Sequence, residues 1–434
     1  MKQYFALIVG AGCSSFSFTK ALNDSGILQK ISYNKPILII DQGKPYSERL
    51  ETDPLDIVEG VGGAGTLAGG KICLPPASGR IWKKTRREMQ LFSEFSEAML
   101  PHENMAYTQI KNPFSGSPLR KKEYMSFLLP ANKKRSYIQK LEADVEKIAT
   151  IKPFTQFVSF EKRCEYSSGE YFEVCLWDKL HDDLETIKTE HLIFATGRSS
   201  AMKLQEWLSG VSVRQQCPDL GIRMSVSLNK TPFFDIGRDT KIKWCRNGVE
   251  ARTFCVCAGG ESVKAELFNQ CYYDGHFAPK ISGLVNMGVL VRSPFLHGID
   301  EAVGYMELLQ KYIGWEMSYK EFKRWYKFLI PETSRYDIVF DSACEFVDKL
   351  IKYHYIEERE SNIQIYLPSC DNFNPIIETD ANFETAYNNL YVIGDAAGIS
   401  RGYVQAMWSG YCAARNIVDK ALRDCEENGR RVYG

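Results

Sequence analysis

The sequence lacks an excess of charge, a long apolar run and an ordered set of metal ligands. Its 54 Lys and Arg are balanced by 54 Asp and Glu, so no global field exists to hold a polyanion. No stretch approaches the ~20 apolar residues needed to span a bilayer. The six His residues form no His-x-x-x-His pair, and the cysteines form no Cys-x-x-Cys pair. These absences exclude a membrane-spanning helix and argue against a zinc site. The sequence also lacks the Gly-x-Ser-x-Gly motif that would indicate a hydrolase.

The N-terminus also shows no export signal. Met1 and Lys2 lead directly into the apolar run Phe5–Val9, which is too short for the core of a signal peptide. Thirteen cysteines, an odd number without regular spacing, would be hazardous in an oxidising compartment. We therefore expect a cytoplasmic protein. Its 434 residues, 44% of them hydrophobic and 25% charged, are typical of a globular chain with two or three folding units.

The beginning of the chain has the pattern of a dinucleotide-binding turn. The run Phe5–Val9 is followed by Gly-Ala-Gly-Cys-Ser-Ser and then by helical spacing of apolar residues. Gly10 is placed to make the turn, and Gly12 lets the backbone approach a pyrophosphate. A helix beginning near Ser14 offers free N–H groups to that charge. Ser15 replaces the third glycine of the usual fingerprint, so an ordinary glycine-rich turn remains the alternative.

A second apolar run strengthens the nucleotide interpretation. Ile37–Ile40 ends at Asp41, where a carboxylate can accept hydrogen bonds from an adenosine ribose and would reject a 2′-phosphate. The distance from Gly10 to Asp41 is longer than usual, and the segment 25–35 is expected to form the loop that absorbs the excess.

Two further strand-and-turn segments follow in order. His191–Phe194 leads into Ala-Thr-Gly, and Leu390–Ile393 leads into Gly-Asp. The segment Phe157 to Trp177 reads as two strands around Ser167, Ser168 and Gly169. This succession resembles the FAD enzymes related to glutathione reductase and para-hydroxybenzoate hydroxylase. The resemblance implies a β-meander, an aspartate that binds a ribityl hydroxyl, and a helix that points its positive end at the flavin.

A narrower resemblance covers both ends and much of the middle of the chain. The glycine-dense segment Val61–Lys71 is similar to a loop of a family of FAD-utilising dehydrogenases, which also share later motifs. In this chain those motifs are Asp219–Arg223, Thr253–Gly260, Leu284–Val291 and Gly394–Gly410. Two departures stand out: Ala68 and Gly69 replace the Ser-Asp of the family, and Ala258 replaces its Pro.

The resemblance implies FAD as the cofactor. A second fingerprint, as expected for an NAD(P)H-binding domain, is absent, but this does not exclude NADH or NADPH as a transient electron donor to the flavin. No metal is expected. The residues expected to hold FAD are Gly10, Gly12, Ser14, Ser15, Asp41, Gln42, Gly62, Gly63, Ala64, Gly65, Lys71, Val158, Thr196, Gly197, Gly394, Asp395, Gly398, Arg401, Gly402 and Tyr403.

Three cations are candidates for catalysis. Lys71 and Arg401 lie in loops expected near the flavin, where a cation would favour the reduced anion; each could instead bind an FAD phosphate or cap a helix. Arg223 could clamp a substrate carboxylate, with a structural ion pair as the alternative. Cys255 and Cys257 alternate along an expected strand, so their side chains share one face. A redox-active pair is one interpretation, but a flat backbone would place the two cysteines poorly for an unstrained disulfide.

The expected fold is α/β, with a discontinuous Rossmann-like FAD-binding domain that contains a β-meander, and an inserted α+β substrate domain. The FAD-binding domain is expected over residues 1–80, 136–200 and 379–434, and the substrate domain over 201–378. Residues 81–135 form a basic insert: the stretch 80–140 has thirteen Lys and Arg against five acids. A solvated helical face explains this charge as well as an anionic partner does.

The sequence therefore predicts an FAD-dependent oxidoreductase that transfers hydride through flavin N5 between FAD and a small organic substrate. One alternative is an FAD-dependent monooxygenase that uses NAD(P)H and oxygen. Another is a flavoprotein that acts on an RNA or protein partner through the basic insert, although the balanced net charge makes nucleic acid the weaker expectation.

Overall fold

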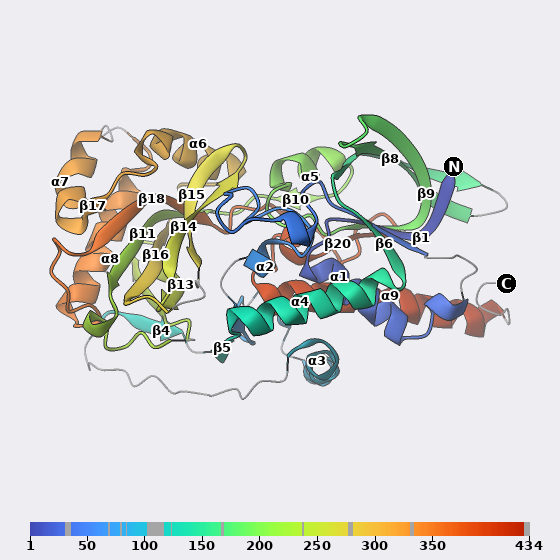
Figure 1. The fold of residues 1–434 in the computed structure, drawn as a ribbon, viewed down its shortest axis with the longest axis horizontal. Coiled ribbons are helices and arrows are strands. Elements are labelled where there is room, and N and C mark those ends of the chain that lie inside the picture. Colours follow the sequence, from blue (N-terminus) through green and yellow to red (C-terminus); the bar gives the residue numbers. More distant parts are fainter. Residues whose placement is uncertain are drawn as a thin grey trace.

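The computed structural model describes residues 1–30, 36–67, 70–78, 80–83, 85–101, 117–122, 124–165, 169–236, 238–276, 281–329 and 334–428. Ala68 and Gly69, which depart from the family pattern, lie outside the described residues, as do Ser167 and Ser168 of the expected turn and part of the basic insert. The described chain forms two lobes that lie side by side along the long axis of the molecule (Figure 1).

The first lobe is built on five parallel strands in the order β6-β2-β1-β9-β20. The apolar runs Ile37–Ile40 and Leu390–Val392 are buried along their whole length, as parallel strands under helices require. These strands are β1 (Lys2–Val9), β2 (Ile37–Ile40), β6 (Ala149–Lys152), β9 (Asp183–Phe194) and β20 (Leu390–Val392). The order is that of a Rossmann-like sheet, so the predicted α/β class is confirmed.

An antiparallel meander extends the same sheet. It consists of β7 (Thr155–Glu165), β8 (Gly169–Asp178) and the first half of β9. The second half of β9 pairs in parallel with β1. One long strand therefore serves both parts of the sheet, and the predicted meander is confirmed.

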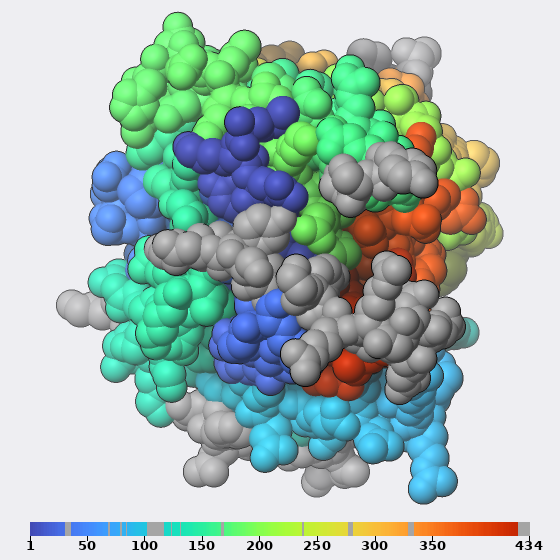
Figure 2. All heavy atoms as spheres, turned by 90° about the vertical axis from the view of Figure 1, so that its right-hand side faces the viewer, coloured from blue at the N-terminus to red at the C-terminus, as the bar shows by residue number. Residues whose placement is uncertain are grey.

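Helices cover the parallel strands on one side. Helix α1 (Cys13–Asp24) packs against α9 (Tyr403–Asn428), and α3 (Arg86–Met99) and α4 (Ala131–Glu146) lie beside them. Figure 2 shows this end of the lobe, with α3 along its lower edge. The side chain of Thr85 accepts a hydrogen bond from the Glu88 N–H and caps α3.

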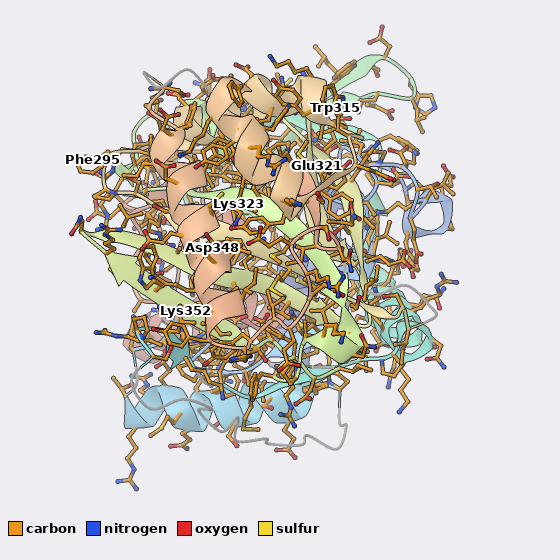
Figure 3. The ribbon with its side chains drawn as sticks, turned by 90° about the vertical axis from the view of Figure 1, so that its left-hand side faces the viewer. Phe295, Trp315, Glu321, Lys323, Asp348 and Lys352 are labelled. Atoms are coloured by element: carbon orange, nitrogen blue, oxygen red, sulfur yellow. The ribbon has the colours of Figure 1, made fainter. Side chains whose placement is uncertain are left out.

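The second lobe is a seven-stranded antiparallel sheet in the order β17-β18-β11-β16-β13-β12-β4. Three helices cover its outer face, and Lys323 of α7 forms an ion pair of 3.2 Å with Asp348 of α8 (Figure 3). Its elements are β4 (Arg120–Lys122), β11 (Asp219–Ser227), β12 (Lys241–Arg246), β13 (Val249–Ala258), β16 (Leu284–Arg292), β17 (Met317–Ser318), β18 (Gln364–Asp371), α6 (Ile299–Leu309), α7 (Tyr319–Leu329) and α8 (Asp337–Lys352).

Short elements complete the chain. They are α2 (Ala64–Leu67), α5 (Ala201–Trp207), the pairs β3 (Lys71–Cys73) with β5 (Ser126–Leu128), β10 (Val213–Arg214) with β19 (Ile376–Ile377) and β14 (Glu261–Leu267) with β15 (Gln270–His276), and 3-10 turns at Leu28–Lys30, Tyr46–Glu48, Leu228–Lys230, Gln310–Tyr312 and Gly394–Ala397. Within the described ranges, no helix has the length and apolar character needed to cross a membrane.

The described part of the basic insert is divided between the lobes. Trp82, Phe95 and Phe127 are buried in the apolar core of the first lobe, whereas β4 pairs with β12 in the sheet of the second. The aromatic residues of this segment therefore act as core anchors, and one of its lysines, Lys134, is buried and lines the cavity between the lobes.

Candidate functional site

One cavity lies where the two lobes meet. The carboxyl ends of β1, β2 and β9 line it from the first lobe through Val9, Ile40 and Ala195. Residues that lie in or beside β13, including Phe254 and Cys255, line it from the second lobe. Ligands of open α/β sheets bind at the carboxyl ends of the strands, so this cavity is the candidate site.

The turn after β1 presents backbone to the cavity. Gly10 has a φ of +102°, and a Cβ at this residue would stand 2.5 Å from the carbonyl oxygen of Ala195, so only glycine fits. Helix α1 begins at Cys13 with no side-chain cap and no acidic residue in its first turn. A Cβ on Gly63 would lie 3.0 Å from the Cα of Gly12. Uncapped N–H groups beside two closely spaced glycine backbones form an anion site suited to a pyrophosphate.

The glycine-rich loop is held from behind by Arg49, which the sequence analysis missed. Its guanidinium is buried and donates to the carbonyl oxygens of Val61, at 2.7 Å, and Gly63, at 3.0 Å. It also donates to the Thr66 hydroxyl at 2.8 Å. Burial lowers the pKa of Arg49 to about 10. No local pattern around Arg49 reveals this role, because its partners follow it by 7 to 17 residues.

Asp41 lies at the end of β2, beside the turn. Its two carboxylate oxygens accept hydrogen bonds from the N–H groups of Ala11 and Gly43, each at 2.9 Å. The nearby Glu59 also lines the cavity, and burial raises the pKa of its carboxyl, opposed by a hydrogen bond with Gln42. Asp41 keeps lone pairs for a hydroxyl ligand while it fixes the turn.

The C-terminal motif closes the cavity on another side. The Asp395 carboxylate accepts a hydrogen bond of 2.8 Å from Arg401, whose Nε lies 2.6 Å from a carboxylate oxygen of Asp371. Burial opposes the charge of Arg401, but Asp371 and Asp395 hold its pKa above the ordinary value. Gly402, with a φ of +110°, leads into α9 at Tyr403, and both line the cavity. The positive end of α9 is therefore directed at this region.

Most residues predicted to hold a cofactor line this one cavity, and four do not. The Ser15 hydroxyl donates to the Gly12 carbonyl oxygen inside α1. Val158 lies on the meander and is exposed. Gly394 packs against Ser14, and Gly398 packs against the backbone of Pro375; these two glycines shape the turn behind the cavity.

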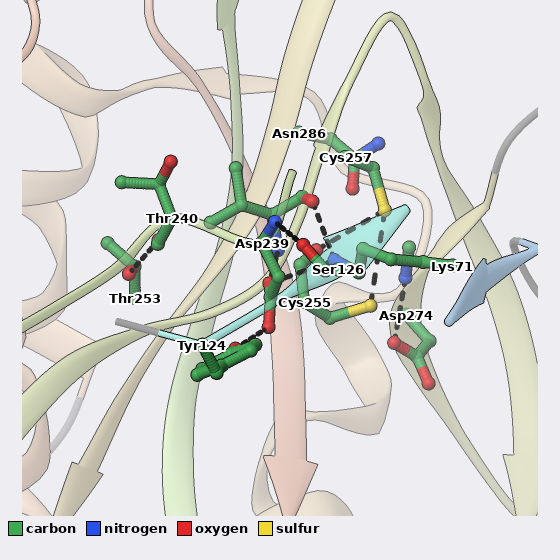
Figure 4. A network of polar contacts seen from close by, with 12 residues as sticks. Lys71, Tyr124, Ser126, Asp239, Thr240, Thr253, Cys255, Cys257, Asp274 and Asn286 are labelled. Atoms are coloured by element: carbon green, nitrogen blue, oxygen red, sulfur yellow. Dashed lines mark hydrogen bonds and ion pairs between the residues drawn. The ribbon is translucent and has the colours of Figure 1, made fainter. Parts of the chain in front are cut away.

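Lys71 reaches into the second lobe. Its ammonium contacts Asp239 at 2.8 Å and donates to the Val256 carbonyl oxygen at 2.7 Å (Figure 4). Both side chains are more than nine-tenths buried. Burial opposes both charges, but each partner stabilises the other, so the pKa of Lys71 is raised and that of Asp239 is lowered. Lys71 is thus a buried ion-pair residue at the cavity wall.

Lys241 is a cavity-lining cation that the sequence analysis also missed. Burial and the nearby Arg252 lower its pKa to about 8. Its Nζ lies 5.9 Å from the ring centroid of Tyr124 and 5.8 Å from that of Phe254. In sequence Lys241 is one of two lysines on a short strand, and nothing separates it from an ordinary surface lysine.

Arg223 does not reach the cavity. It is fully buried and donates to the Cys255 carbonyl oxygen at 2.8 Å and to the Asn286 side chain at 3.0 Å. Its Nη1 lies 3.5 Å from a carboxylate oxygen of Asp274. This position favours the structural ion pair over a clamp for a substrate carboxylate. Across the described ranges, no group of three His, Cys, Asp or Glu residues is arranged to hold a metal ion.

No protein-family model matches the chain, and no curated protein matches its sequence. Solved structures similar to this chain include an aklavinone-11 hydroxylase in a ternary complex with FAD and aklavinone, at a TM-score of 0.48 and 12% identity, over 97% of this chain and 63% of that one. The chain thus spans less than two thirds of that hydroxylase. A flavoprotein/dehydrogenase from Cytophaga hutchinsonii has a TM-score of 0.43 and 11% identity, over 99% and 80%. The p-nitrophenol 4-monooxygenase of Pseudomonas putida DLL-E4 has a TM-score of 0.42 and 8% identity, over 99% and 82%.

Proposed function

We propose that this chain is an FAD-dependent oxidoreductase that acts on a small organic substrate. The observation that carries the proposal is the convergence, on one cavity, of the uncapped α1 N-terminus, the Asp41 carboxylate, the glycine-rich loop and the Asp395 region. Each comes from a different part of the chain, and together they match the parts of a dinucleotide: pyrophosphate, ribose and a second polyol.

The chain's own residues divide the work of binding. The N–H groups at the start of α1 and the backbone of Gly62 and Gly63 would hold the pyrophosphate. Asp41 would accept from the adenosine ribose, and Asp395, oriented by Arg401, from the ribityl chain. When bound, FAD supplies hydride or electron transfer at its flavin ring. The positive end of α9 would favour negative charge on that ring.

The second lobe would supply the substrate pocket. Phe254 and Tyr124 provide apolar surface, and Lys241 provides a cation whose pKa of about 8 lets it hold or release a proton near neutral pH. An oxyanion such as a phenolate or enolate fits a wall of this kind. The Lys241 ammonium supplies the opposite charge, and the two aromatic rings near it supply apolar surface for the rest of the substrate.

The test is an anaerobic visible spectrum of the protein after reconstitution with FAD and removal of free cofactor. We expect a bound flavin spectrum and FAD on denaturation. Addition of NADH or NADPH then separates two classes. Bleaching followed by oxygen uptake coupled to substrate hydroxylation would indicate a monooxygenase. A flavin that stays oxidised until an organic substrate is added would indicate a dehydrogenase. No retained flavin with excess FAD would overturn the proposal.

A further inference from the structure

The strand that carries Cys255 and Cys257 is broken at this pair. Strand β13 pairs with β16, and its register shifts between Phe254 and Cys257, which leaves Cys255 and Val256 outside the regular ladder. Cys255 has a φ of +42°, a conformation that a residue with a side chain rarely adopts. Such bulges re-aim side chains beside functional sites. The flat strand expected from the sequence is therefore wrong at this point.

Buried charges hold the bulge in place. Arg223 donates to the Cys255 carbonyl oxygen at 2.8 Å, Lys71 donates to the Val256 carbonyl oxygen at 2.7 Å, and the Val256 N–H donates to Asp239 at 3.0 Å. The peptide groups that have no strand partner in the bulge thus form hydrogen bonds with three side chains from other parts of the chain. This support maintains a backbone conformation that the local sequence alone disfavours.

The bulge brings the two sulfur atoms together in unequal surroundings. They lie 4.0 Å apart (Figure 4). Cys255 is partly exposed and lines the cavity, whereas Cys257 is 1% exposed. Gly260 makes room for the second thiol, because a Cβ on Gly260 would stand 2.9 Å from the Cβ of Cys257. The Cys255 sulfur is therefore accessible from the cavity, and the Cys257 sulfur lies buried behind it.

The same surroundings separate the acidities of the two thiols. A hydrogen bond from Cys257 and the charge of Lys71 lower the pKa of Cys255 to about 6, although burial opposes this. The hydrogen bond to Cys255 and burial raise the pKa of Cys257 above its ordinary value. An accessible thiolate beside a buried thiol is the arrangement needed for attack and then resolution.

We propose that Cys255 and Cys257 form a thiol–disulfide exchange site whose substrates are small disulfide compounds that enter the cavity. The Cys255 thiolate attacks one sulfur of the substrate disulfide; a mixed disulfide forms, and the first substrate thiolate leaves. Cys257 loses its proton and attacks the Cys255 sulfur; an intramolecular disulfide forms, and the second substrate thiolate leaves. The protein dithiol is oxidised by two electrons, and the substrate disulfide is reduced to two thiols. This activity goes beyond the proposed flavin chemistry and requires no cofactor.

The experiment uses the full chain with glutathione disulfide as the probe. Reduced protein is mixed with the probe, quenched in acid, alkylated with iodoacetamide and digested with trypsin. Cleavage after Arg252 and Lys264 places both cysteines in one peptide, 253–264. We expect this peptide to lose two hydrogen masses and to take up no alkylating agent. The same peptide carrying two alkyl groups after prolonged exposure to the probe would overturn the proposal.

Two single variants test the order of the steps. Cys257→Ser should stop at the mixed disulfide, with one glutathione on Cys255. Cys255→Ser should slow modification of Cys257 by about tenfold or more, because the Cys257 thiol is 1% exposed and burial by itself disfavours its thiolate. Equal glutathione uptake by the two variants would contradict the assigned roles. Cys73→Ser is the matched control: Cys73 lines the same cavity, and its removal should leave disulfide formation in the peptide unchanged.

Thermal melting of each variant establishes that it is folded. Since the readout is the mass of one peptide, it is obtained with or without bound flavin. Loss of exchange in a protein that retains flavin would reject this inference alone, and exchange in a protein that binds no flavin would reject only the proposed oxidoreductase.

Discussion

Gly410 of α9 lies directly against Ser14 of α1: a Cβ on Gly410 would stand 2.1 Å from the Ser14 carbonyl oxygen. The two helices thus meet backbone to backbone, immediately behind the first turn of α1. This contact sets the position of the N–H groups that face the cavity, so the packing of the first lobe and the geometry of the site depend on one another.

Replacing Gly410 with Ala should destabilise the protein. Helix propensity alone favours Ala by about 1 kcal/mol, but overpacking against rigid backbone costs up to about 3 kcal/mol. We expect a net loss on the order of 2 kcal/mol in the free energy of urea unfolding. Gly283→Ala is the control, because a Cβ there meets nothing within 4 Å; equal effects of the two changes would contradict the packing argument.

His191 should make the protein sensitive to acid. Burial lowers its pKa to about 3, from an ordinary value of 6.5, so the folded state stays neutral while the unfolded state takes up a proton. Stability from this group is intact above pH 6.5 and falls as the pH drops toward 3. Relative to His191→Leu, the native protein should lose about 2 kcal/mol between pH 6.5 and 5.

Urea unfolding at several pH values measures this difference for His191. The control is His181→Gln, at an exposed histidine of the meander hairpin, which should follow the native protein. A constant difference between the His191 variant and the native chain across this pH range would show that folding does not lower the pKa of His191 and would contradict the prediction.

Alkylation of Cys255 should follow a titration near pH 6. The groups that face its thiol are Cys257 on its own strand, Lys71 on β3, Arg223 on β11 and Asp274 on β15. Because the pKa is lowered to about 6, the rate constant should rise with pH up to about 7 and then level off.

Peptide mass spectrometry after short iodoacetamide pulses gives the rate for Cys255. Cys271 provides an internal comparison, since burial raises the pKa of its thiol; at pH 7 we expect it to react at least about tenfold more slowly. Lys71→Met should move the midpoint for Cys255 upward. A rate that still climbs steeply above pH 8 in the native protein would contradict the assigned acidity.

Asp41→Asn should weaken the binding of FAD under the proposed function. The carboxylate accepts from two backbone N–H groups, whereas an amide has one accepting oxygen and leaves one N–H facing a donor. The ribose hydroxyl also loses its charged acceptor, and a hydrogen bond to a charged group contributes about 1.5–3 kcal/mol, so the dissociation constant should rise about tenfold or more. Flavin fluorescence titration measures it, and Asp24→Asn, at the far end of α1, should bind as the native chain does.

The parts of the fold that follow from local pattern are those that the sequence predicted well. The apolar run Ile37–Ile40 is strand β2 with the same bounds, because a short run buried on both faces has few alternatives. Asp41, Asp395 and most of the predicted glycines line the cavity, because the motifs that pointed to them keep a fixed distance from strand ends. Arg49 was missed because most of its partners are backbone carbonyl oxygens, which carry no sequence pattern.

The second lobe was predicted less completely because its contacts with the cavity join residues that lie far apart in the sequence. Lys71 was expected beside the flavin, but its ammonium lies in a buried pair with Asp239, 168 residues later in the chain. Such long-range pairs depend on how the lobes meet. Likewise, the bulge at Cys255 arises from side chains of β3 and β11 rather than from its neighbours in sequence, so alternation along the strand predicted a regular backbone there.

The contact between Lys71 and Asp239 has a mechanical consequence. Lys71 follows the glycine-rich loop, whereas Asp239 precedes a strand of the second lobe. Separating the lobes at this point would break both the ion pair between Lys71 and Asp239 and the hydrogen bond from Lys71 to the Val256 carbonyl oxygen. The pair therefore ties the segment after the glycine-rich loop to the second lobe and opposes separation of the two lobes at this point.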